Sequence, residues 1–146
     1  MHRNISRGVL LTAVLLLTNL VASSQVQRPC SNADLKGDYG FSFHGTNLGL
    51  KVDMLMVGKF NADGQGNFKG TESQSVSGKV AKGPFTGTYV VNSDCTGSAE
   101  ISFFPPNVEK VDFVLVADGD EVLMIDVGGN TLESGEAKRQ FRKNKK

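Results

Sequence analysis

The segment VEKVDFVLVADGDEVLMIDV, residues 108–127, decides the fold class of this chain. Apolar and polar residues alternate from residue 111 to residue 113, and continuous apolar runs follow at residues 113–117 and 122–125. Short apolar runs bounded by turn residues are typical of β-strands. Asp118 and Gly119 form a two-residue turn signal between them, because glycine accepts the positive φ that a primed hairpin turn requires. The segment therefore predicts an antiparallel β-hairpin.

The same pattern continues over the rest of the chain after residue 24. Short alternating runs are separated by Gly, Asn, Asp and Pro, and no stretch keeps a helical period. Eight strands are predicted, at residues 39–45, 50–60, 67–76, 85–91, 98–104, 108–117, 121–127 and 131–141. The connections are so short that each strand should pair with the next in sequence, which predicts an up-and-down meander.

An open meander leaves two unpaired edge strands. Closure into an eight-stranded antiparallel up-and-down barrel removes both edges, and we expect this all-β fold. Eight strands enclose an interior just wide enough to be packed with side chains or to hold one small ligand. A two-sheet β-sandwich is the alternative, since the same alternation and turns permit it.

The first 24 residues have the three parts of a secretory signal peptide. Two arginines precede an apolar run at residues 8–22, and small residues follow at 22–24. The apolar run is shorter than the ~20 residues of a membrane-spanning helix, so no stable membrane insertion is expected after its removal. The prediction is a secreted or periplasmic protein with one barrel domain at residues 25–141 and a basic tail at residues 142–146.

Cys30 and Cys95 are the only two cysteines. In an oxidising compartment an even pair is most simply a disulfide, and closing so long a loop could stabilise the fold by about 4 kcal/mol. A metal site on two cysteines would need further ligands, and His44 is the only histidine outside the signal segment. Neither a metal site nor a cofactor is expected.

The charges are distributed unevenly along the chain. Of 16 basic residues, two lie in the signal segment and six lie between residues 138 and 146. The rest of the chain has 8 basic and 15 acidic residues, a net charge of −7. An acidic body argues against nucleic acid as a partner, because phosphate binding needs a basic face.

The alternation also predicts which side chains could line the barrel. Aromatic residues provide rigid walls and methionine adapts to irregular apolar sites, so these types suit a ligand cavity. The candidates are Tyr39, Phe41, Phe43, Met54, Met56, Phe113 and Met124. The strand at residues 67–76 has only small or polar side chains on either face apart from its ends, which predicts that one wall is hollow or wet.

No catalytic motif is present, and whether the chain is an enzyme is left open. The candidates for chemistry are polar groups within apolar strands, namely Glu100, Asp112 and the phenols of Tyr39 and Tyr89. If residues 105–107 form a three-residue turn, Glu100 lies opposite Asp112, and two carboxylates in an apolar cavity would have their pKa values pushed apart. The alternative is that these acids face solvent or pair with lysines, and that the tyrosines pack at the rim.

Four segments resemble the small exported bacterial barrels whose fold is similar to allene oxide cyclase. They are LKGDYGFSF at residues 35–43, GKFNADGQG at 58–66, GTYVVN at 87–92 and DFVLV at 112–116. The resemblance implies an apolar cavity, oligomeric assembly and, for some members, cyclisation of an apolar substrate. No catalytic residue is carried over, because no motif of that group maps position by position. Lipocalins, the other familiar eight-stranded barrels, usually begin with Gly-x-Trp, and this chain has no tryptophan.

The leading expectation is a secreted barrel that binds a small apolar molecule in its interior. The alternatives are a cyclase or isomerase that confines an apolar substrate, and a structural or interaction module without a cavity. A homo-oligomer is expected as well, because the strands at residues 50–60, 108–117 and 121–127 are apolar on both faces and the outer face then needs a cover.

Overall fold

A computed structural model describes residues 28–103, 106 and 108–141, so the proposed signal peptide and the tail at residues 142–146 lie outside it. Eight β-strands and two short 3₁₀-helices, η1 (Asn32–Asp34) and η2 (Ala117–Gly119), make up the fold. The strands are β1 (Lys36–Asn47), β2 (Val52–Asp63), β3 (Asn67–Val76), β4 (Lys79–Val91), β5 (Thr96–Ser102), β6 (Val108–Val116), β7 (Glu121–Asp126) and β8 (Thr131–Arg139). Across these ranges, no helix has the length and apolar character needed to cross a membrane.

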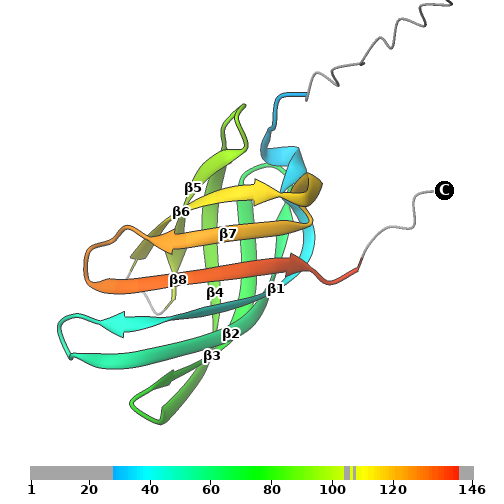
Figure 1. Ribbon diagram of the computed structural model, residues 1–146. Coiled ribbons are helices and arrows are strands. Elements are labelled where there is room, and N and C mark those ends of the chain that lie inside the picture. The colour runs from blue at the N-terminus through cyan, green and yellow to red at the C-terminus, as the bar shows by residue number, and fades with distance from the viewer. Residues whose placement is uncertain (1–27, 104–105, 107, 142–146) are drawn as a thin grey trace, which may run out of the picture.

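The strands form one closed antiparallel barrel in which each strand pairs with the next (Figure 1). Pairing of β8 with β1 closes the barrel, and the paired residues run from Tyr39 opposite Arg139 to Asn47 opposite Thr131. The prediction of an eight-stranded up-and-down barrel is confirmed, and the two-sheet sandwich is wrong. Closure leaves no unpaired strand edge, as the short connections favour.

Strand β4 begins at Lys79, six residues before the predicted start. Ser77 and Gly78, with φ of 50° and 80°, make a tight turn directly between Val76 and Lys79, which are Cα partners. Positive φ at both positions is the geometry of a primed hairpin turn. Residues 79–82 are all exposed and show no alternation, so pairing with β3, rather than burial of one face, makes them part of the strand.

The connection between β6 and β7 also differs from the predicted two-residue turn. Ala117, Asp118 and Gly119 all have positive φ and form η2. A Cβ atom on Gly119 would lie 2.4 Å from the carbonyl oxygen of Asp34, so only glycine fits this close approach. The connection is therefore shaped by contact with the N-terminal segment and not by the hairpin alone.

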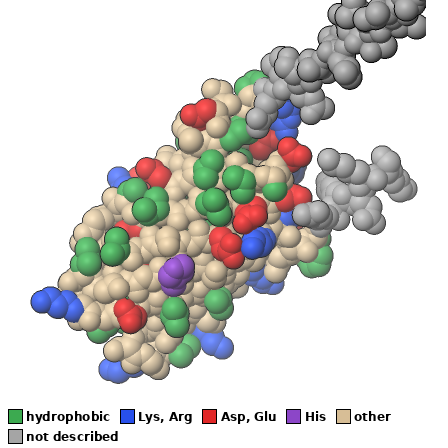
Figure 2. Space-filling view, in the orientation of Figure 1, with side chains coloured by type: hydrophobic (Ala, Val, Ile, Leu, Met, Phe, Trp, Pro, Cys, Tyr) green, Lys and Arg blue, Asp and Glu red, His purple; other side chains and the backbone are tan. Residues whose placement is uncertain are grey.

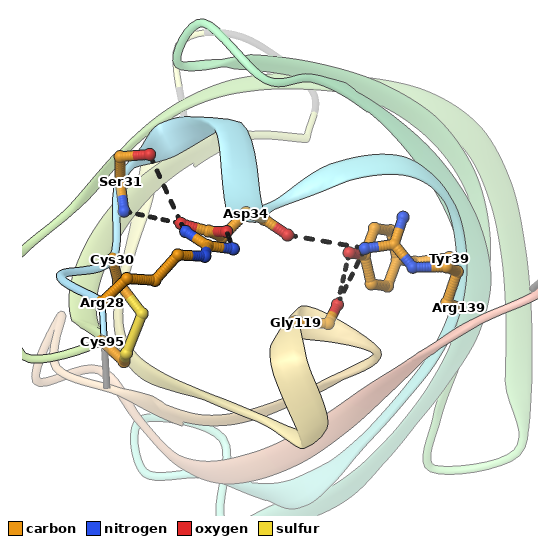
Figure 3. A network of polar contacts seen from close by, with 8 residues as sticks. All are labelled: Arg28, Cys30, Ser31, Asp34, Tyr39, Cys95, Gly119 and Arg139. Carbon is orange, nitrogen blue, oxygen red and sulfur yellow. Dashed lines mark hydrogen bonds and ion pairs between the residues drawn. A yellow bond between two sulfur atoms is a disulfide. The ribbon is translucent and has the colours of Figure 1, made fainter. Parts of the chain in front are cut away.

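Residues 28–35 pack across the barrel end at which this turn lies, which we call the disulfide end (Figure 3). Cys30 is bonded to Cys95 in the β4–β5 turn, with 5.1 Å between their Cα atoms. Arg28 forms an ion pair with Asp34, whose carboxylate also accepts the backbone N–H of Ser31 at 2.8 Å. The predicted disulfide is thus present and attaches the N-terminal segment to the sheet.

A second group of contacts joins this end to the last strand. The Tyr39 hydroxyl donates to the carbonyl oxygen of Gly119 at 2.6 Å, and the Arg139 guanidinium lies 4.7 Å above the Tyr39 ring. Arg139 also donates to Gly119 at 3.1 Å and pairs with Asp120 at 2.8 Å. The opposite end, which we call the hairpin end, holds the turns at 48–51, 77–78 and 127–130 (Figure 1).

Five inward phenylalanines each lie directly across from an inward glycine on the neighbouring strand. A Cβ atom on any of these glycines would lie 2.2–2.7 Å from the facing ring, so each ring rests on its partner's bare backbone. These Phe–Gly pairs are Phe41 with Gly58, Phe43 with Gly135, Phe68 with Gly87, Phe85 with Gly70 and Phe113 with Gly97. Glycines covered by aromatic rings allow strands to bend while the interior stays filled.

The outer surface keeps several large apolar side chains exposed. We call Leu55, Val57, Leu123, Ile125 and Leu132, which are 43–67% exposed, the outer apolar positions. Figure 2 shows hydrophobic side chains standing in small separate groups on the face in view. The two-sided apolar character of β2 and β7 is therefore real, and self-association through the outer face stays a prediction.

Candidate functional site

All seven predicted interior residues lie inside the barrel. Tyr39, Phe43, Met54, Met56 and Phe113 are buried, and Phe41 and Met124 pack partly buried against the same core. Phe41, Phe43, Phe113 and Met124 line a central cavity of about 50 Å³. Alternation of inward and outward side chains along each strand explains this placement.

The cavity is narrow, and its lining is apolar apart from the phenol of Tyr89. Seven phenylalanine rings, Met124 and aliphatic side chains surround it. A cavity of about 150 Å³ holds benzene, and this one has about a third of that volume. The aromatic side chains therefore fill most of the interior, and a bound molecule would require an adaptable side chain such as Met124 to move.

Three glutamates project into the interior from different strands. Glu72 on β3 and Glu133 on β8 are each 6% exposed, and Glu109 on β6 is half-buried. We call these three residues the carboxyl cluster. Oε2 of Glu72 and Oε1 of Glu133 are buried without a hydrogen-bond partner among the residues that the structure describes. Such oxygens are rare in folded proteins and mark a cost in stability.

Glycines lie opposite Glu72 and Glu133 on the neighbouring strands. Glu72 lies opposite Gly58 on β2 and Gly83 on β4, and Glu133 lies opposite Gly45 on β1. A Cβ atom on Gly45 would come within 2.5 Å of the Glu133 Cγ atom. Gly45 thus leaves space for the Glu133 side chain, just as the glycine of each Phe–Gly pair leaves space for the ring opposite it.

Burial and mutual repulsion disfavour ionisation of the cluster. Burial, followed by the charge of Glu133, raises the pKa of Glu72 from 4.5 to about 7. Burial, followed by the charges of Glu133, Asp126 and Glu72, raises the pKa of Glu109 to about 7. The pKa of Glu133 is also raised, by burial and then by Asp126. Glu72 and Glu109 therefore hold protons near neutral pH that ordinary glutamates would have lost.

The carboxyl cluster adjoins the apolar cavity. The Phe41 ring rests on Gly58, and Gly58 is the direct neighbour of Glu72 on the other side. Glu109 lies opposite Ile101, which lines the cavity. A molecule in the cavity would consequently have its apolar part among the rings and one end toward the carboxyl groups.

The predicted carboxylate pair does not form. Glu100 lies opposite Lys110, with 3.3 Å between Oε1 and Nζ, and Asp112 lies opposite Ser98. Both acids are exposed on the outer face. The expected pairing of Glu100 with Asp112 is wrong because the connection between Ser102 and Val108 has five residues instead of three, which moves the register.

The two candidate phenols face inward, and their hydroxyl groups are occupied. Tyr39 donates to Gly119, and burial raises its pKa to about 12. The Tyr89 hydroxyl donates to the Leu35 carbonyl oxygen at 2.6 Å and accepts the Gly64 N–H at 3.0 Å. Both phenols therefore hold turns and the N-terminal segment in place at the disulfide end.

The carboxyl cluster was not among the candidate site residues that the sequence predicted. Glu109 precedes Val111 and Phe113 by two and four residues, and Glu133 precedes Gly135 and Ala137 in the same way. Residues two and four positions apart in a strand point to the same face, so this spacing could have identified Glu109 and Glu133 as inward-facing acids. Glu72 lies in a strand whose two faces are similarly polar, so its orientation needed the register.

The chain matches no protein-family model and no curated protein. The resemblance to allene oxide cyclase-like barrels stays a prediction. Within residues 28–103 and 108–141, no three His, Cys, Asp or Glu side chains are grouped so that they could hold a metal ion.

Proposed function

We propose that this chain is an exported barrel that binds a slender, largely apolar molecule in its interior. The observation that carries the proposal is the aromatic-lined central cavity of about 50 Å³. Its lining is rigid, and Met124 supplies an adaptable side chain that can move to admit a longer chain. Export is supported by the Cys30–Cys95 disulfide, which is typical of oxidising compartments.

The composition of the interior also supports binding over a purely structural role. Carboxyl groups inside a barrel reduce its stability, and apolar side chains of similar size would avoid that cost. Residues that lower stability without serving the fold are typical of functional sites. Glu72 and Glu133, buried and lacking partners for one oxygen each, have this character.

The methionines provide a direct test of binding. Met54, Met56 and Met124 are the only methionines after residue 1, and all three lie inside the barrel. Protein with ¹³C-labelled methionine methyl groups should be titrated with 1-hexanol and followed by NMR. We expect a saturable shift of the Met124 methyl signal, because Met124 lines the cavity.

A cavity-filling substitution and a matched control make this test specific. Ala99 lines the cavity, and Ala99→Val should weaken 1-hexanol binding, whereas Ser98→Val on the outer face of the same strand should not. Unshifted methyl signals in the wild-type protein, or equal binding by Ala99→Val, would overturn the proposal. A structural module would then be the reading that fits the filled interior.

A cyclase or isomerase is the second candidate. The observation that favours it is a pair of carboxyls, Glu72 and Glu109, whose pKa values of about 7 suit proton transfer near neutral pH. Native mass spectrometry of protein purified from the oxidising compartment detects a co-purified molecule, and chromatography of that molecule before and after incubation with the protein separates the two functions. A binding protein returns the added molecule unchanged. An enzyme that is given this molecule in excess releases an isomer with the same mass and a different chromatographic retention time.

A further inference from the structure

The carboxyl cluster indicates which polar group the bound molecule has. We infer that the barrel recognises an ammonium group on a slender alkyl chain, with the chain in the apolar cavity and the nitrogen beside Glu72 and Glu133. This inference rests on the proposed function, since it assumes that the cavity is occupied. It adds the chemical class of the ligand, a primary alkylamine.

The first support is the hydrogen-bonding state of the two acids. Glu72 and Glu133 are each more than nine-tenths buried, and each has one carboxyl oxygen without a partner in the described part of the chain. A buried acceptor that lacks a donor is favourable only when something else supplies one. Both acids are on the inward face of the barrel, and Glu72 neighbours Gly58, on which the ring of the cavity-lining Phe41 rests.

The second support is the distribution of positive charge. Every lysine in residues 28–103 and 108–141 is exposed, and Arg28 and Arg139 lie at the disulfide end. The other acid near the cluster, Asp126, already accepts hydrogen bonds from Gly128 N–H at 3.2 Å and from the Thr131 hydroxyl at 2.7 Å. The inward-facing neighbour Gln74 carries no charge. The described residues thus give the cluster no cation of their own.

The third support is the comparison of possible polar groups. A carboxylate on the ligand would be repelled, and a hydroxyl offers a single donor. A metal ion needs converging ligands, and no such group was found in the described ranges. An ammonium carries three donors and needs only one or two carboxylates, and hydrogen bonds between ionised partners are stronger than neutral ones. An amine on an alkyl chain also matches an apolar cavity that carboxyl groups adjoin.

The test compares three ligands of equal length, namely hexylamine, 1-hexanol and hexanoate. Each is titrated at pH 8 against the methionine-labelled protein. We expect hexylamine to bind about tenfold more tightly than 1-hexanol, since a charge-assisted hydrogen bond exceeds a neutral one by roughly that factor. Hexanoate should bind most weakly. Methylamine, which has no apolar chain, should leave the Met124 signal unchanged.

Variants assign the preference to the cluster. Glu133→Gln and Glu72→Gln should each reduce the preference for hexylamine over 1-hexanol to less than about threefold, because they remove the charge and keep the shape. Glu100→Gln, on the outer face, should keep it at about tenfold. Circular dichroism shows whether each variant folds, and if one does not, the other decides.

The outcomes separate the inference from the proposed function. If 1-hexanol binds and hexylamine binds no more tightly, the amine inference is overturned and the apolar binding site remains. If Glu100→Gln lowers the preference as much as the cluster variants do, general attraction to an acidic surface explains it, and the inference is again overturned. If neither ligand binds, the proposed function itself fails.

Discussion

Replacing Glu72 with glutamine should stabilise the folded barrel at pH 8 and leave its stability almost unchanged at pH 4. The pKa of Glu72 is raised from 4.5 to about 7 in the folded protein. Below pH 4.5 the acid is protonated in both the folded and the unfolded chain and contributes nothing. As the pH rises toward 7 the unfolded chain releases its proton first, so the wild-type protein loses stability until the folded acid ionises too.

The magnitude follows from the size of that change in pKa. At 1.36 kcal/mol for each pH unit, a rise from 4.5 to about 7 corresponds to roughly 3 kcal/mol at pH 8 if the surroundings stay fixed. Water that reaches the carboxylate on ionisation reduces the cost, so we expect a gain of about 1–2 kcal/mol for Glu72→Gln. A gain of that size raises the melting temperature by roughly 5–10 °C in a domain of this length.

Urea denaturation followed by circular dichroism at pH 4, 6 and 8 measures the difference in free energy of unfolding. Glu100→Gln is the matched control, because its exposed pair with Lys110 is worth less than about 1 kcal/mol at any pH. The lowered pKa values of Asp34 and Asp63 stabilise the fold by a constant amount above pH 6, and this contribution is lost only as the pH falls below their ordinary value, so these two acids add no change in stability between pH 6 and 8. A variant that is less stable than the wild-type protein at pH 8, or a wild-type stability that does not fall between pH 4 and 8, would refute the reasoning.

Three further predictions concern the fold and the surface. Replacing both Cys30 and Cys95 with serine should lower the free energy of unfolding by about 4 kcal/mol, because the disulfide closes a loop with a sequence separation of 65. Urea denaturation that gives the variant and the wild-type protein the same free energy of unfolding would contradict this. Gly87→Ala should cost about 1–3 kcal/mol, because the new Cβ would lie 2.2 Å from a facing ring, whereas Gly49→Ala, with its nearest contact at 3.5 Å, should be close to neutral by thermal denaturation. Sedimentation at micromolar concentration should show a dimer or trimer that Leu55→Lys disrupts, and a monomeric wild-type protein would mean that the outer apolar positions are tolerated in water.

Much of the fold could be predicted because strong local signals agree. Phe41 and Phe43 alternate with polar residues, so the inward face of β1 is evident before any pairing is known. Short turns rich in glycine and asparagine then specify which strands are neighbours, and the resulting meander closes because open edges are unfavourable. The disulfide followed from the count of cysteines alone.

The site could not be predicted because it depends on register. Glu72 faces inward only because β3 pairs with β2 and β4 in one of two alternating phases, and both faces of β3 look alike in sequence. The distance in sequence between Glu72 and Glu133 gives no hint that β3 and β8 direct them into the same space. Glu100 and Asp112 were placed together by assuming a shorter turn, and two extra residues in that turn separated them.

The Phe–Gly pairs have a consequence for how such an interior can change over generations. If the glycine of a pair is replaced by a larger residue, the new side chain collides with the phenylalanine ring. If the phenylalanine is replaced by a smaller residue, a void is left above the glycine. A single substitution at either position is therefore destabilising. The two changes together, for example Phe85→Gly with Gly70→Phe, preserve the volume while moving the ring to the next strand. In descendants of a common ancestor we would expect phenylalanine and glycine to exchange places across a strand pair. Such exchanges would let the shape of the cavity drift without a change in how much of the barrel is filled.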